Sequence, residues 1–101
     1  MVAISCGSSA YDIPADKRAG VASMGVSNTG RTDITEAQWV AIAARACNEG
    51  GWDWEVAGRI ADEMIGPAQP GSGAHTVWLL LTVGCHELIP DDALLRGPPG
   101  L

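Results

Sequence analysis

The sequence has no phenylalanine, one tyrosine and one lysine, Lys17, so four tryptophans supply nearly all of its aromatic bulk. Alanine and glycine are abundant by contrast. This combination is the bias that a GC-rich genome produces, and we therefore expect a bacterial or phage source. The bias excludes no mechanism, but it makes the positions of the few tryptophans informative.

Long apolar runs and paired cysteines are also missing. The longest uncharged apolar run, residues 77–85, is far shorter than the ~20 residues that a membrane span requires. Residues 1–10 lack the basic and apolar regions of a signal peptide. Cys6, Cys47 and Cys85 are odd in number and have no C-x-x-C spacing, which argues against a disulfide framework. We expect reduced thiols, a cytoplasmic location and no membrane partner.

Positive charge is scarce. The formal net charge is -6 and the isoelectric point is about 4.5. Proteins that bind nucleic acids usually present a basic face, so we expect no nucleic-acid partner. The acidic residues are spread along the chain rather than gathered in a tail. Such a distribution is typical of a solvated surface, and its sharper interpretation is a docking site for a basic partner.

A chain of 101 residues can bury one modest core and is one domain at most. Residues 1–31 are rich in Gly, Ser and Ala, and we interpret them as an N-terminal arm. This arm could contain a short helix over residues 15–23 or a short strand over residues 21–26. The predicted helical domain covers residues 32–97, and residues 98–101 form a predicted tail.

The clearest structural signal is a helix start at Thr35. Thr35 is a predicted N-cap, and Gln38 three residues later would complete a capping box. Ile34 and Trp39 are placed to form a hydrophobic staple around this cap. Apolar residues then recur at helical spacing, namely Trp39, Ile42, Ala43, Ala46 and Cys47. Gly50 stands where a left-handed C-cap is expected.

A second helix is predicted after Asp53, which is a favourable N-cap. Its apolar stripe consists of Val56, Ala57, Ile60, Ala61 and Met64. The dipeptide Gly66-Pro67 ends it. The two helices therefore form a hairpin joined by a tight turn at Gly50-Gly51.

Residues 74–89 form an ambiguous apolar segment. Its length favours a buried helix, whereas its β-branched and aromatic residues would also suit a buried strand over residues 76–84. Pro90 ends the segment, and a short helical turn is expected over residues 91–96. We predict a mainly α fold, a small helical bundle built on the hairpin. The alternative is an α/β fold with the strand at 76–84.

The strongest catalytic candidate is the tripeptide Cys85-His86-Glu87. A nucleophilic thiol needs a nearby base, and a histidine base needs a carboxylate that orients it. Adjacent residues on a helix point about 100° apart, so these side chains would not meet. We favour a buried structural cysteine beside a surface His–Glu pair and predict no catalytic residue. A thiol-dependent enzyme using Cys85 or Cys47 is the alternative.

Metal-ligand residue types are present without the spacing that metal sites use. Cys47, Cys85, His75 and His86 could together supply a tetrahedral set, but none of them has C-x-x-C or H-x-x-x-H spacing. His86 begins an H-E-x-x-H pattern in which Pro90 occupies the position of the second histidine. We predict no metal site and no cofactor.

The hairpin also allows a helix-turn-helix DNA-binding regulator as a further alternative. A recognition helix needs donor side chains on its outer face. The second helix offers Arg59 beside Glu55, Asp62 and Glu63, and these acids would repel phosphates. The acidic face therefore argues against this alternative.

The tryptophans carry the remaining functional signal. Trp39 and Trp78 lie on apolar segments, whereas Trp52 and Trp54 are two residues apart at the turn and cannot both point inward. Exposed tryptophans are common at interaction hot spots. The apolar surface around Trp54 and residues 77–81 is also large for two short helices to cover.

We therefore predict a non-enzymatic, small acidic protein-interaction module or assembly subunit. Its predicted partner-binding residues are Trp52, Trp54 and Trp78. The partner would be another protein or a second copy of the chain in a homo-oligomer.

Overall fold

The computed structural model describes residues 11–66 and 73–97, and every regular element within them is helical. The elements are α2 (Ala15–Thr29), α3 (Glu36–Glu49), α4 (Trp54–Ile65), α5 (Gly73–Gly84), the 3-10 turn η1 (His86–Leu88) and α6 (Asp91–Arg96). The predicted mainly α bundle is confirmed. The alternative strand at 76–84 is wrong, because those residues belong to α5. Residues 1–10 of the predicted arm and the predicted tail at 98–101 lie outside the described residues.

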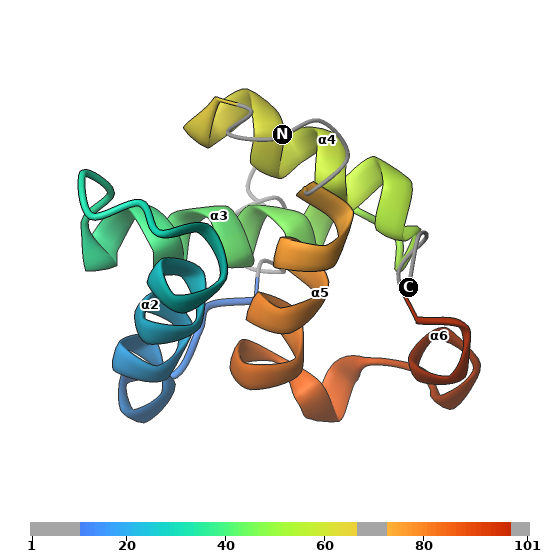
Figure 1. The fold of residues 1–101 in the computed structure, drawn as a ribbon. Coiled ribbons are helices and arrows are strands. Elements are labelled where there is room, and N and C mark those ends of the chain that lie inside the picture. Colours follow the sequence, from blue (N-terminus) through green and yellow to red (C-terminus); the bar gives the residue numbers. More distant parts are fainter. Residues whose placement is uncertain (1–10, 67–72, 98–101) are drawn as a thin grey trace, which may run out of the picture.

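The bundle is arranged around α5. In Figure 1, α3 and α4 run side by side in opposite directions, α5 crosses them, and α2 lies beside α5. Val77, Leu80 and Leu81 of α5 are 0% exposed. Their spacing places them on one face of the helix, and that face is buried. A helix that contacts three neighbours is apolar on most of its surface. This central position explains why residues 77–81 have no polar side.

The start signals of both hairpin helices are confirmed. The Thr35 hydroxyl accepts a hydrogen bond from the Gln38 N–H at 3.1 Å, and the Gln38 side-chain oxygen accepts one from the Thr35 N–H at 2.8 Å. The Asp53 carboxylate accepts from the N–H groups of Glu55 at 3.0 Å and Val56 at 3.3 Å. These bonds satisfy donors that have no partner inside the helix.

The predicted left-handed C-cap at Gly50 is wrong. Gly50 has a φ of -79°, and the left-handed residues are Gly51 at 62° and Trp52 at 60°. Gly50 instead allows the two hairpin helices to approach each other. A Cβ at this position would lie 2.6 Å from the Ala46 carbonyl oxygen and 3.1 Å from the Ala57 Cβ. Trp52 was expected at the turn, but its left-handed conformation was not indicated by the sequence pattern.

Part of the predicted N-terminal arm is a helix of the bundle. Residues 15–29 form α2, which is longer than the helix considered over 15–23 and takes the place of a strand over 21–26. Val21 and Gly25 on this helix are buried. Because α2 packs against α3 and α5, it shares their core.

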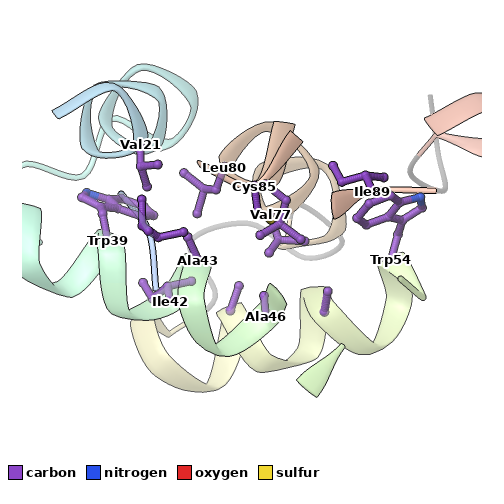
Figure 2. Close-up of a cluster of buried hydrophobic side chains, with 14 of the residues drawn as sticks. Val21, Trp39, Ile42, Ala43, Ala46, Trp54, Val77, Leu80, Cys85 and Ile89 are labelled. Atoms are coloured by element: carbon purple, nitrogen blue, oxygen red, sulfur yellow. The ribbon is translucent and has the colours of Figure 1, made fainter. Parts of the chain in front are cut away.

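The apolar stripe predicted for α3 points into that core. Trp39, Ile42, Ala43 and Ala46 are buried, as expected from their spacing. Figure 2 shows the Trp39 ring beside Val21 of α2. Burial of this ring supplies a large share of the apolar area that the small core removes from water.

Arg31 forms a bidentate ion pair within the loop before α3 and connects that loop to the end of α4. The Arg31 guanidinium donates to both carboxylate oxygens of Asp33 at 2.8 Å, and it also donates to the Ile65 carbonyl oxygen at 3.2 Å. The hydrogen bonds from Arg31 lower the pKa of Asp33 to about 2.

We expect the Asp33 carboxyl to titrate by NMR with a midpoint of about 2, and Arg31→Met to return that midpoint toward 3.8. The folded-state pKa lies below the unfolded value, so the pair stabilises the fold above the unfolded pKa. That contribution is lost as the pH falls through about 2. Arg59→Met on the exposed face of α4 is the control. An Asp33 midpoint that is the same with and without Arg31 would contradict this assignment.

Candidate functional site

The hairpin turn contains an unusual backbone conformation. Among the described residues, Trp52 is the one non-glycine residue with a positive φ, at 60°. The left-handed region costs an L-residue roughly 1–2 kcal/mol, so neighbouring contacts must hold it there. The Arg96 guanidinium donates to the Trp52 carbonyl oxygen at 2.9 Å, and the Asp53 N–H donates to the Gly50 carbonyl oxygen at 3.1 Å. The ring of Trp52 is partly exposed and packs against the edge of the core.

Trp54 lies inside the core. Its side chain is 3% exposed, and its indole N–H donates to the Ala93 carbonyl oxygen at 3.3 Å. Figure 2 shows the ring beside Ile89. Trp54 therefore attaches α6 to the start of α4 and places Arg96 next to the turn.

A surface pocket with a volume of about 660 Å³ opens at this junction, and we call it the turn hollow. Its lining comes from the turn, the first residues of α4 and the end of α6, namely Gly51, Trp52, Asp53, Trp54, Glu55, Arg96 and Gly97. The hollow is wide and shallow, and it has both polar and apolar walls. Such a shape suits a protein side chain or a short peptide segment better than an enclosed small molecule.

The charge around the turn hollow is mainly negative. Asp53 and Glu55 line it. Arg96 is the one base among the lining residues, and it is paired with Asp92 at 3.3 Å. Its guanidinium is therefore already engaged with the protein. The charged groups of the lining that remain available to a bound partner are therefore the carboxylates of Asp53 and Glu55.

The three predicted partner-binding tryptophans do not share one surface. Trp52 and Trp54 both line the turn hollow, although Trp54 is buried. Trp78 is on α5, outside this lining. Its indole nitrogen and Nδ1 of His75 are buried without a hydrogen-bond partner among the described residues. Most of the surface expected around Trp54 and residues 77–81 is covered, since α2 and α4 pack on α5, whereas Trp78 and Leu79 are partly exposed.

The residues considered for thiol chemistry do not form a thiol–imidazole pair. Cys85 is 0% exposed, whereas His86 and Glu87 of η1 are exposed. The side chain that interacts with the Cys85 thiol is Cys47. Glu87 pairs instead with Lys17, whose Nζ lies 3.1 Å from its carboxylate. In residues 11–66 and 73–97, no three metal-ligating side chains come together.

The part that α6 plays is not indicated by any sequence pattern. A helical turn over 91–96 was expected and is confirmed, but nothing placed Arg96 against Trp52 or Ala93 against Trp54. These partners are 44 and 39 residues apart in the chain. Periodicity and capping patterns report contacts within a few residues and carry no signal over that separation.

Comparison with protein-family models, curated proteins and solved structures found no match for this chain. In the part of the chain that the structure describes, no helix has the length and apolar content needed to cross a membrane. A function for this chain is therefore inferred from the geometry of the turn hollow.

Proposed function

We propose that this chain is a non-enzymatic protein-interaction module whose turn hollow binds a basic segment of a protein partner. The observation that carries the proposal is Trp52, a partly exposed aromatic ring held in a left-handed conformation at the rim of an acidic hollow. Backbone strain of this kind persists where surrounding contacts impose it, and it clusters at functional sites. Tryptophan is also the residue most enriched at interaction hot spots.

The chemistry of the partner follows from the charges. Arg or Lys side chains would be attracted by Asp53 and Glu55, and a guanidinium can also stack on an indole face. A second copy of this chain would bring the same acidic groups to the contact, and the like charges would repel. Charge complementarity therefore favours a basic partner over self-association at this face.

An apolar side chain of the partner would also find a place in the hollow. Trp52 and Trp54 both line it and give it an apolar wall. Interfaces commonly combine an apolar centre with a polar rim. A segment that alternates basic and apolar residues fits this combination.

The test uses two short peptides as probes, one alternating Arg and Leu and one alternating Glu and Leu. We expect the Arg–Leu peptide to shift the indole N–H signal of Trp52 in NMR spectra, and the shift to weaken as salt is added. Trp52→Asn keeps a residue that tolerates positive φ but removes the ring. We expect this variant to bind about thirtyfold more weakly, the loss typical of a hot spot.

Met64→Ala is the matched control, because Met64 is a partly exposed apolar residue at the far end of α4, outside the hollow. It should bind the Arg–Leu peptide as the unsubstituted protein does. Equal binding of both peptides, or unchanged binding by Trp52→Asn, would overturn the proposal. Sedimentation over a dilution series adds a third outcome. Dimerisation that Trp52→Asn abolishes would assign the hollow to a second copy instead.

A further inference from the structure

Two cysteines from distant parts of the sequence meet at one end of the core. Cys47 is in the last turn of α3 and is partly exposed, and Cys85 directly follows α5 and is 0% exposed. Both belong to the same hydrophobic cluster, and for each thiol the largest influence on its pKa is the other thiol. Neither forms a disulfide in this structure. The pair therefore combines one thiol that solvent can reach with one that only its partner can reach.

Tyr11 fixes the two segments that carry these thiols. Its backbone N–H donates to the Asn48 side-chain oxygen at 2.8 Å, and its carbonyl oxygen accepts from the Asn48 side-chain nitrogen at 2.9 Å. Its hydroxyl donates to the Gly84 carbonyl oxygen at 3.1 Å. Asn48 follows Cys47 and Gly84 precedes Cys85. Tyr11 therefore hydrogen-bonds to a sequence neighbour of each cysteine. The approach of the thiols is therefore set by hydrogen bonds as well as by packing.

The two thiols have unequal acidity. The hydrogen bond from the Cys85 thiol lowers the pKa of Cys47. The same contact and burial raise the pKa of Cys85. The other titratable groups that act on the pair are Tyr11, Glu87 and Lys17, and the last two are paired with each other. A thiolate is the nucleophilic form of cysteine, so Cys47 is the reactive member.

We propose that Cys47 and Cys85 are a redox-active pair, in which Cys47 attacks a hydroperoxide and Cys85 then closes an intramolecular disulfide. With hydrogen peroxide, the Cys47 thiolate attacks one oxygen, the O–O bond breaks, and hydroxide leaves. The product is a sulfenic acid on Cys47. The Cys85 sulfur attacks the sulfenic sulfur, the S–O bond breaks, and the hydroxyl leaves with the Cys85 proton as water. The two sulfurs are oxidised by two electrons, and the peroxide is reduced.

Each member suits its step. Cys47 is the thiol open to solvent, and small oxidants act on exposed thiolates. Cys85 needs no access to solvent, because the sulfur that it attacks is already beside it. The disulfide would connect the end of α3 to the end of α5. This proposal uses no residue of the turn hollow, and it stands or falls independently of the proposed protein-binding function.

The test treats the protein with hydrogen peroxide in a Cys6→Ser background, because Cys6 lies outside the described residues and would otherwise compete. We expect a peptide map under non-reducing conditions to show one linked pair, Cys47 with Cys85. Cys85→Ser keeps a hydrogen-bond donor but cannot close the disulfide, so it should accumulate a sulfenic acid on Cys47 that dimedone traps. Cys47→Ser should leave Cys85 reduced. Near-UV circular dichroism confirms that each variant is folded.

A second measurement separates a reactive pair from two packed thiols. Cys85→Ala removes the hydrogen-bond donor, so alkylation of Cys47 by iodoacetamide should require a higher pH than in Cys85→Ser and should be several-fold slower at neutral pH. Equal pH profiles of the two variants would overturn the assignment of Cys47 as the activated thiol. Peroxide treatment that leaves both cysteines reduced, or that links only separate molecules, would overturn the disulfide itself.

Discussion

Replacing Trp54 with alanine is expected to lower the free energy of unfolding by about 3–5 kcal/mol, the usual cost of deleting a buried aromatic ring. The ring is 3% exposed, and its removal leaves a cavity between the turn and α6. It also leaves the Ala93 carbonyl oxygen without its indole donor. A small domain is stabilised by only about 5–15 kcal/mol in total. Urea unfolding followed by circular dichroism would therefore show a much lower midpoint.

Trp54→Phe is the control for the size of the ring. It keeps most of the apolar volume and loses the indole N–H, so we expect a cost of about 1 kcal/mol. Trp52→Asn, two residues away, is the control for position, because Trp52 is partly exposed. If Trp54→Ala cost no more than Trp52→Asn, the ring of Trp54 would not be the attachment of α6 to α4.

Gly25→Ala is expected to destabilise the fold by about 1–3 kcal/mol, although alanine is the better helix former. A Cβ on Gly25 would lie 2.4 Å from Cδ2 of Trp39 and 2.6 Å from two further ring atoms. Trp39 is 1% exposed, so its rigid ring has no free space to enter. The helix α2 would have to move away from α3, which would loosen the core along the whole contact. The same urea titration measures this loss.

Gly20→Ala on the same helix is the matched comparison. Gly20 is exposed, and its added Cβ would meet a single methyl group of Val83 at 3.2 Å. A small rotation of that side chain relieves the contact. We expect stability to be unchanged or to rise by up to about 1 kcal/mol from helix propensity. Equal effects of the two substitutions would show that α2 does not pack on Trp39 through Gly25.

Glycine explains why α2 was underestimated from the sequence. Each glycine inside a helix costs about 1 kcal/mol in propensity, so Gly20 and Gly25 weaken the local helix signal of this segment. In the bundle, the missing side chain of Gly25 is the space that the Trp39 ring occupies. Burial of an indole outweighs the propensity cost, and α2 continues to Thr29.

The hairpin could be predicted because its signals are local. The capping box of Thr35 and Gln38, the N-cap of Asp53 and the apolar stripe of α3 all involve residues within a few positions of one another. The same reasoning placed the helical turn over 91–96 correctly. For α5, the sequence predicted only a preference for helix, because an uninterrupted apolar run suits a buried strand as well. Its central position in the bundle was not predicted.

The sequence by itself determined the two helices of the hairpin, their boundaries and the net negative charge, since these follow from neighbouring residues and from composition. Tertiary structure alone decided which tryptophan is buried at the turn, that Arg96 holds Trp52 in a left-handed conformation, and that Cys47 meets Cys85. Each of these contacts joins residues that lie far apart in the chain. Such contacts depend on how whole elements pack around α5, and no periodic pattern along the chain records that packing.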